Sequence, residues 1–291
     1  MSGNFTDVLT NTTGFLPSVN NGNPNLRAEQ GYTFTAGGVY QPHWLPGASL
    51  TIDTYHTVIR DAITIVQGQN ASIQSACNAS GGSSPYCALI TRPDAVTDTS
   101  AANAATAYYD VPENLAKVWT YGIDMEADYS RRIFNRRFNG RVFLTYQPHI
   151  YYEQPGVATV DQGDAGFGSN GLTPSPSTQL SAFFDYQLTP EFNVSLFEHY
   201  RNGYHRSGVQ NQVWADPIVP SFASTNITLA YDLGSKLHIK DSSLYFSVTN
   251  LFDSNPPLSG YYSGTTSAGQ AYEFSDDPVG RAFVFGIRIR G

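Results

Sequence analysis

The chain has 291 residues, with 16 basic and 24 acidic side chains and a formal charge of −8. Charged residues make up 14% of the chain, against roughly a quarter in soluble domains, whereas aromatic residues reach 13%. This composition argues against intrinsic disorder, and an acidic chain without a basic stripe argues against nucleic acid as the main partner. No stretch approaches 18 apolar residues, so we expect no transmembrane helix, but a membrane β-barrel, whose strands are only half apolar, is compatible with the sequence.

Apolar and polar residues alternate with a period of two along much of the chain, which predicts an all-β protein. The clearest alternation lies at 119–129, where apolar and aromatic residues alternate with small or acidic ones. At 191–204, Glu198 falls in the apolar phase, which predicts a bulge or a position at the rim of the sheet. In chain order, the nine predicted strands lie at 32–40, 49–60, 119–129, 139–152, 179–188, 191–204, 226–233, 244–249 and 283–290.

Short and long connections alternate between these strands. The short ones are 41–48, 131–138, 189–190 and 234–241, and the long ones are 61–116, 153–177, 205–220 and 254–280. Bacterial outer-membrane barrels show this order, with short periplasmic turns and long outer loops. We therefore predict an antiparallel up-and-down transmembrane β-barrel, with a soluble all-β protein as the alternative. Bacterial barrels have even strand numbers and the first residues show no signal peptide, so we expect these nine strands to belong to a larger barrel.

The alternation also predicts which side chains face lipid and which face the lumen of the barrel. We expect the carboxylates of Asp124, Glu126 and Asp128, together with Arg288, to face the lumen; a functional carboxylate cluster is the alternative for the first three. The residues expected to face lipid are the apolar halves of five strands: Trp119, Tyr121, Ile123, Met125, Leu180, Phe184, Ile227, Leu229, Leu244, Phe246, Phe283, Phe285 and Ile287.

Two further features stand out in the connections. Cys77 and Cys87 are the only cysteines and lie in a Ser/Gly/Asn-rich stretch, which predicts a small disulfide and an oxidising compartment; two unpaired thiols are the alternative. Four arginines crowd the turn at 131–138, where they either meet anionic lipid headgroups or are simply solvated.

No group of residues predicts catalysis. The six histidines are scattered, without a metal-ligand spacing, and the glycine-rich pieces lack the helix that a phosphate loop requires. We therefore expect no enzyme activity, no catalytic residues, no metal site and no cofactor.

Five motifs, in order along the chain, resemble those of TonB-dependent receptors, the active transporters of Gram-negative outer membranes. Three of them involve a strand and its flanks: Leu45–Tyr55 followed by Ile59–Ile63, Asn114-Leu-Ala followed by Gly122-Ile-Asp124, and Val248-Thr-Asn-Leu-Phe-Asp253. The other two are Asn23-Pro-Asn-Leu-Arg-Ala-Glu29, similar to the family's N-P-x-L-x-x-E stretch, and Asp277-Pro-Val-Gly-Arg281, similar to the lead-in to its last strand.

The resemblance implies a 22-stranded barrel, of which residues 1–291 form the C-terminal portion with about nine strands, and an N-terminal plug domain that has no counterpart in this sequence. It implies uptake of a bulky nutrient, such as a siderophore, a cobalamin or a glycan, across the Gram-negative outer membrane. The implied partners are outer-membrane lipid, TonB, the plug and an unknown extracellular ligand. The alternative is a non-transporting surface adhesin or binding module.

Overall fold

The computed structural model describes residues 2–167, 175–207, 216–234, 242–263, 267–271 and 276–289. The chain forms two compact units, each described here by itself. Unit 1 holds Met1–Tyr32, Thr57–Trp119 and Tyr151–Val160, and unit 2 holds Thr33–His56, Thr120–Ile150 and Asp161–Gly291. The strands that contribute residues to both units are β3 (Gln30–Tyr40), β4 (Ala48–Gln67), β6 (Ala107–Ile133), β7 (Arg136–Gln154) and β8 (Val157–Asp161).

Unit 1 contains the helices of the described chain. Helix α1 (Ala71–Ala79) begins after Asn70, whose side-chain oxygen accepts a hydrogen bond from the Ser72 N–H at 2.9 Å. The 3-10 helices η1 (Pro85–Leu89) and η2 (Ala101–Asn103) follow, with β5 (Ile90–Thr91) between them. The sequence predicted a long connection at 61–116 and did not predict the helices and the short strand within it. None of the described helices has the length and apolar character needed to cross a membrane.

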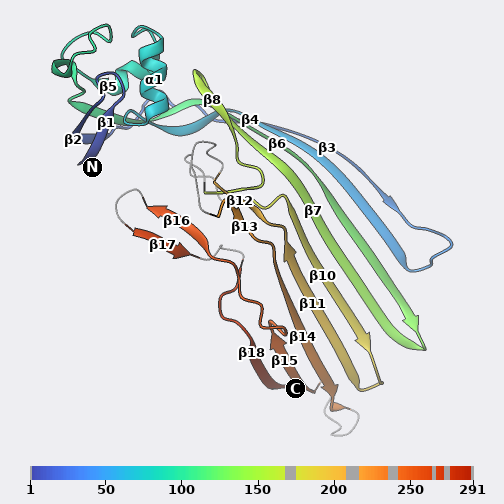
Figure 1. Cartoon of the computed structure of the whole chain (residues 1–291). Coiled ribbons are helices and arrows are strands. Elements are labelled where there is room, and N and C mark those ends of the chain that lie inside the picture. Colours follow the sequence, from blue (N-terminus) through green and yellow to red (C-terminus); the bar gives the residue numbers. More distant parts are fainter. Residues whose placement is uncertain are drawn as a thin grey trace. The chain divides into compact units, whose positions relative to one another are not determined.

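An N-terminal hairpin that the sequence did not predict packs beside α1 (Figure 1). Strands β1 (Ser2–Asp7) and β2 (Thr12–Asn20) are antiparallel, and the end of β2 runs parallel to the start of β6. The buried Gln74 of α1 joins the helix to the hairpin: its Oε1 accepts the Val8 N–H at 2.8 Å, and its Nε2 donates to the Thr6 carbonyl at 3.1 Å.

Unit 1 has a conventional apolar core, and the predicted disulfide is part of it. Cys77 of α1 and Cys87 of η1 are bonded, with their Cα atoms 5.0 Å apart, so the disulfide prediction is confirmed. The bond ties the helix to the 3-10 turn at the edge of the second of two buried clusters. These clusters are Val66, Ile73, Tyr86 and Leu89, and Cys77, Ile90, Ala105 and Tyr108.

One ion pair in unit 1 is buried. Arg92 Nη1 lies 3.1 Å from Asp7 Oδ2, and both side chains are nearly inaccessible. Burial alone would raise the pKa of Asp7, but hydrogen bonds from the Ala105 and Leu9 N–H groups and the Arg92 guanidinium outweigh it, so this pKa lies below its ordinary value. The ionised pair therefore stabilises the hairpin against the segment that follows α1.

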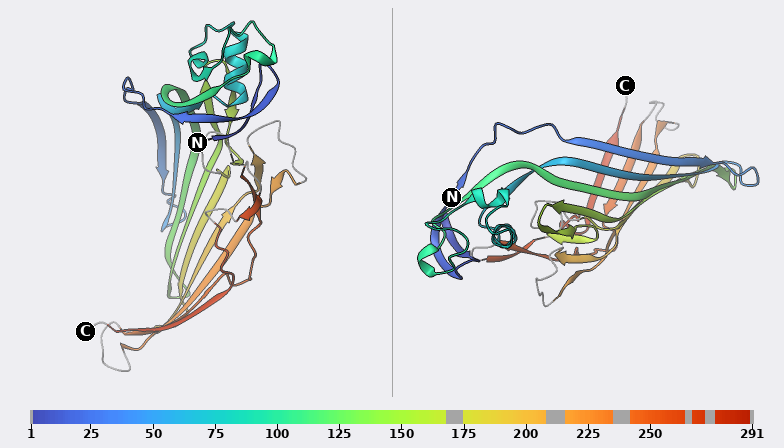
Figure 2. Two further views of the ribbon diagram at one scale, coloured as in Figure 1. Left: turned by 90° about the vertical axis from the view of Figure 1, so that its left-hand side faces the viewer. Right: turned by 90° about the horizontal axis from the view of Figure 1, so that it is seen from above.

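Unit 2 is an antiparallel sheet in which neighbours in sequence are neighbours in space (Figures 1 and 2). The nine predicted strands are present, as β3, β4, β6, β7, β10, β11, β14, β15 and β18. From β6 the order along the sheet is β7, β10 (Thr178–Gln187), β11 (Phe192–Arg201), β14 (Phe222–Asp232), β15 (Ser243–Thr249) and β18 (Ala282–Arg288). This is the predicted all-β, up-and-down architecture, seen as a sheet that does not close within the described residues.

The short turns of unit 2 lie at one end of its strands, as predicted. Tyr186, at the end of β10, lies opposite Phe138 at the start of β7, and Phe192 of β11 lies opposite Tyr231 of β14. The β6–β7 turn consists of Phe134 and Asn135, both with positive φ (50° and 61°), which fits the twist of a tight hairpin. Beyond Gly234, the predicted turn at 234–241 lies outside the described residues.

The opposite end of unit 2 carries short strands and a buried arginine. The short strands are β9 (Ala165–Phe167), β12 (Tyr204–Ser207), β13 (Ile218–Val219), β16 (Ser259–Ser263) and β17 (Ser267–Ala271). Arg201, at the end of β11, forms a buried two-point ion pair with Asp276, and its Nη1 donates to the carbonyls of Asn202 and Pro220. One guanidinium thus holds both the β11–β14 and the β15–β18 connections.

The bulge expected at Glu198 is absent. Pairing runs without interruption from Phe192 to Arg201 against β14, with Glu198 opposite Thr225. Glu198 lies on the apolar face, three residues from the end of β11, and its carboxylate accepts a hydrogen bond from the Thr225 hydroxyl. A neighbouring hydroxyl at the rim satisfies the carboxylate, so the strand needs no distortion.

Candidate functional site

The register of unit 2 separates an apolar face from a polar face. Residues directly opposite one another on paired strands share a face. Phe246 lies opposite both Leu229 and Phe285, and Leu244 lies opposite Ile287. The same pairing puts Leu180, Phe184, Ile227 and Phe283 on the apolar face, through Leu144, Leu196 and Val248. The predicted apolar residues from β10 to β18 therefore form one surface.

None of the thirteen residues predicted to face lipid is buried. Exposure is highest on β18, where Phe285 is 69% and Phe283 64% exposed. On β6, Tyr121 and Ile123 are exposed and Met125 is half-buried. Trp119, in unit 1, stacks on Tyr151 with ring centroids 5.0 Å apart. The set therefore does not form an interior core.

The predicted carboxylates of β6 occupy the polar face and have partners on β7. Arg141 Nε lies 2.6 Å from Asp128 Oδ1 and 3.3 Å from Glu126 Oε1, and the Thr145 hydroxyl donates to Asp124 at 2.8 Å. Arg141 is more than half exposed, so these ion pairs add little stability and mainly orient the groups. The arrangement is a charged wall rather than a pair of carboxylates poised for proton transfer.

Arg288 is not brought near these carboxylates. Arg288 lies on the last strand, β18, opposite Ser243 of β15. Five strands separate β18 from β6 in the sheet. The neighbours of Arg288 line a small hollow of about 310 Å³ near the short turns and include Glu191, Asn193 and Asp232. The four residues predicted to face the lumen thus form two separate charged groups.

Three phenylalanines interrupt the polar face, and sequence reasoning missed them. Phe183 lies opposite both Phe197 and Arg141, so all three side chains share a face. The rings of Phe183 and Phe197 are 4.6 Å apart, and Phe143 meets Phe183 edge-on at 6.4 Å. The Arg141 guanidinium lies 5.7 Å from the Phe143 ring. We call Phe143, Phe183 and Phe197 the aromatic patch.

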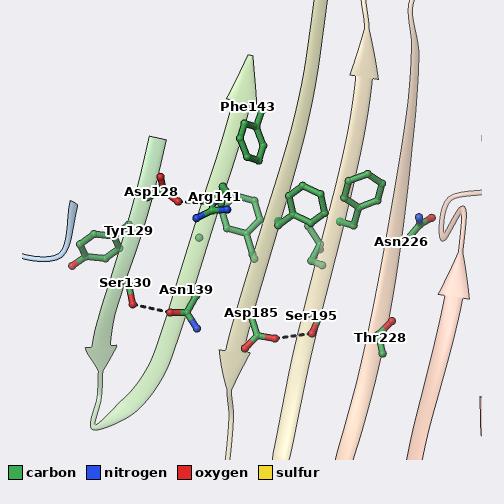
Figure 3. Close-up of a pocket in the computed structure, with 15 residues that line it drawn as sticks. Asp128, Tyr129, Ser130, Asn139, Arg141, Phe143, Asp185, Ser195, Asn226 and Thr228 are labelled. Atoms are coloured by element: carbon green, nitrogen blue, oxygen red, sulfur yellow. Dashed lines mark hydrogen bonds and ion pairs between the residues drawn. The ribbon is translucent and has the colours of Figure 1, made fainter. Parts of the chain in front are cut away.

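The aromatic patch forms the floor of a hollow of about 810 Å³ (Figure 3). The polar groups at its edge are held by hydrogen bonds: Asp185 accepts from Ser195 at 2.7 Å and from Asn193 at 2.6 Å. Figure 3 shows Arg141, Asn226 and Thr228 around the same hollow. Such a site can bind an apolar or aromatic surface bordered by polar groups. Among the described residues, no group of His, Cys, Asp and Glu is placed to hold a metal ion.

Polar residues of the first and third motifs in chain order join segments of unit 1. Asn114 Oδ1 accepts the Arg27 N–H at 2.7 Å, and Asn114 Nδ2 donates to the carbonyls of Arg27 and Asp61. Glu29 Oε1 accepts the Ile63 N–H at 2.7 Å, and Asn23 Nδ2 donates to the Pro112 carbonyl. These side chains therefore join the segment that precedes β3 to strands β4 and β6.

The fourth and fifth motifs in chain order meet at the end of unit 2 opposite the short turns. Asp253 accepts the Arg281 N–H at 3.0 Å, and the two side chains form an exposed ion pair at 3.7 Å. Asn250, with φ of 51°, exchanges two 2.8 Å hydrogen bonds with the backbone of Ser254. The motifs thus shape the chain where it leaves β15 and where it enters β18.

Comparisons with known proteins agree on one family. Residues 2–251 match the family model described as TonB dependent receptor-like, beta-barrel. No curated protein sequence matches the chain.

Solved structures with a similar fold include three receptors. A variant of the ferric enterobactin receptor PfeA from Pseudomonas aeruginosa, in complex with enterobactin, is 16% identical with a TM-score of 0.57, over 95% of this chain and 33% of PfeA. The FrpB iron transporter from Neisseria meningitidis is 12% identical with a TM-score of 0.55, over 92% of this chain and 32% of FrpB. The ferric-catecholate import receptor Fiu from E. coli is 14% identical with a TM-score of 0.53, over 92% of this chain and 28% of Fiu. The chain thus spans about a third of the length of the solved receptors that it matches.

Proposed function

Because this chain belongs to the TonB-dependent receptor β-barrel family, we propose that residues 1–291 form the C-terminal portion of a receptor that takes up a bulky nutrient with energy delivered through TonB. Barrels of this family are proteins of the Gram-negative outer membrane, and so is this chain. The family is one of receptors and transporters rather than of enzymes.

The observation that carries the proposal is the division of unit 2 into two faces. The apolar face, with Phe246 between Leu229 and Phe285, meets lipid. The opposite face, with Asp124, Glu126, Asp128 and Arg288, lines the lumen of the closed barrel. A sheet with exposed apolar side chains on one face and hydrogen-bonded polar groups on the other is suited to a lipid exterior and a wet interior.

Among bulky nutrients, a ferric siderophore is the best-supported ligand. PfeA is a ferric enterobactin receptor, Fiu is a ferric-catecholate import receptor, and FrpB is an iron transporter. At this level of identity the likeness itself concerns the fold, so the ligand is a proposal for this chain.

The aromatic patch is our candidate contact for the plug. Apolar rings on an interior wall are stable when a second surface covers them, and the patch lies midway along β10 and β11, inside the proposed lumen. The double variant Phe183→Ala/Phe197→Ala in the complete receptor should increase amide hydrogen exchange within the plug. The control Phe246→Ala/Phe285→Ala likewise removes two phenyl rings, from the opposite face, and should leave the plug unchanged. Equal effects of both variants would refute the contact.

Uptake tests the function directly. The complete gene should be expressed in a strain that lacks its own siderophore receptors, and ferric siderophores, cobalamin and glycans offered in turn. We expect uptake of one ferric siderophore that requires both the receptor and TonB. Ligand binding at the surface without TonB-dependent uptake would instead indicate a non-transporting binding protein.

A further inference from the structure

A hollow of about 420 Å³ opens on the apolar face of unit 2, near the short turns. Phe138, Val142 and Phe184 lie on this face because Phe184 pairs with Gly140, Val142 with Ala182, and Phe138 with Tyr186. From the β3–β4 turn, Trp44 and Tyr40 border the hollow and are 76% and 58% exposed. The hollow therefore has aromatic walls on the side where we have proposed lipid.

Arg131 and Arg136, two of the four arginines that flank the β6–β7 turn, lie beside this hollow. Tyr129 and Phe138 line it, and Arg131 and Arg136 follow two positions nearer the turn on the same two strands. Side chains two positions apart on a strand share a face and are about 7 Å apart. Arg131 also lies beside the β3–β4 turn, because the Ser130 N–H bonds to the Gly47 carbonyl at 2.9 Å.

These guanidinium groups lack carboxylate partners. Among the described residues, the side chains of Arg131, Arg132, Arg136 and Arg137 form no ion pair and no hydrogen bond, whereas Arg141, four positions further along β7, has two carboxylates. In a chain of net charge −8, this turn gathers four of the 16 basic residues within seven positions. Like-charged groups held together need anions, and guanidinium binds phosphate with two parallel hydrogen bonds.

We propose that the hollow and the arginine turn together bind one anionic phospholipid of the leaflet that faces the periplasm. An acyl chain lies in the hollow between Trp44, Phe138 and Phe184, and Arg131 and Arg136 bind the headgroup phosphate. Arg132 and Arg137 alternate onto the polar face and contribute only to the positive field. This inference rests on the proposed function, because it requires the apolar face to meet lipid and the short turns to lie on the periplasmic side.

The test is lipid retention by the complete receptor, purified in detergent and measured by native mass spectrometry. We expect phosphatidylglycerol and cardiolipin to remain bound and phosphatidylcholine to be lost. The double variant Arg131→Gln/Arg136→Gln should lower retention about tenfold or more, given about 1 kcal/mol for each basic side chain at an anionic surface. Trp44→Ala should lower retention as well, because it removes a wall of the hollow without changing the charge.

The matched control is Arg132→Gln/Arg137→Gln, which removes the same charge from the same turn on the other face and should change retention less than twofold. Equal losses in the two arginine pairs would overturn the site in favour of a diffuse field, and retention without preference for anionic lipid would overturn it altogether. Heat-modified mobility on gels verifies that each variant is folded. Siderophore uptake is measured separately: uptake can fail while lipid retention behaves as predicted, so failures of the two proposals are distinguishable.

Discussion

Units 1 and 2 place their apolar side chains in opposite ways. In unit 1, Tyr108 and Val66 are 0% and 1% exposed, inside clusters that helices and a hairpin enclose. In unit 2, Phe283 and Phe285 are more than half exposed, and their neighbours across the strands are apolar too. Water selects the first arrangement, whereas the second is stable where hydrocarbon takes the place of water. On our proposal that the apolar face of unit 2 meets lipid, one chain is adapted to two solvents.

The largest expected effect is in unit 1. Asp7→Ala leaves Arg92 buried without its carboxylate, which should cost about 3–5 kcal/mol of local stability. Amide hydrogen exchange of β1 and α1 in the complete receptor measures this loss. Asp98→Ala is the control, because Asp98 is an exposed-loop carboxylate that accepts the Ser100 N–H of its own turn. Similar losses in both variants would mean that unit 1 lacks a water-excluding core.

The next largest effect should separate the two faces of unit 2. Ile227→Arg puts a charge at the middle of β14 on the proposed lipid face and should destabilise the membrane-inserted barrel by about 2–4 kcal/mol. Thr228→Arg, one residue later on the opposite face, should cost about 1 kcal/mol for its lost hydrogen bond to Ser247. Denaturant titrations in lipid vesicles compare the two. If Thr228→Arg proves the worse, our assignment of the faces is reversed.

The disulfide should matter only in unit 1. Reduction of Cys77–Cys87 should lower the local stability of α1 and η1 by about 2–3 kcal/mol, because it releases a constraint on a short loop. Limited proteolysis with and without reductant should show new cleavage near these helices and none in β10–β18. The Cys77→Ser/Cys87→Ser variant should be cleaved equally under both conditions.

Acid should produce the smallest effect, and again in unit 1. Since the folded-state pKa of Asp7 is depressed, its ionisation stabilises unit 1 above the unfolded-state pKa near 3.8, and this contribution is lost as the pH falls through the lower folded-state pKa. Hydrogen exchange should therefore show loosening of β1 below about pH 4. In the Asp7→Asn variant this step should be missing from the pH profile.

The strands of unit 2 could be predicted because their pattern is local. Period-two alternation identifies the strand and its two faces together, so Leu229 and Thr228 are assigned from their neighbours in sequence. The order of the strands and the place of the β6–β7 turn followed from the short connections. The turn itself is tighter than the predicted range 131–138, because β6 extends to Ile133 and β7 begins at Arg136. Glu198 is the exception to this alternation, and its carboxylate is accommodated on the apolar face by a hydrogen bond from the Thr225 hydroxyl on the next strand.

Unit 1 and the aromatic patch could not be predicted because both depend on contacts between distant residues. Asp7 and Arg92 are 85 positions apart, and the hairpin β1–β2 is held by such contacts rather than by strong alternation. The aromatic patch draws one residue from each of three strands, and within its own strand each looks like an exception. The adjacent pair Phe183-Phe184 was the available signal, since two neighbouring aromatics in a strand must occupy opposite faces.

Arg201 links the β11–β14 connection to the β15–β18 connection, although the two are distant in sequence. Its guanidinium binds Asp276, before β18, and the carbonyl of Pro220, before β14. A chimera that takes the β15–β18 connection from another receptor, without a carboxylate at position 276, would leave the Arg201 guanidinium buried without its carboxylate partner. A chimera that exchanges both connections together with β11 would not. We therefore expect changes in these two connections to occur together.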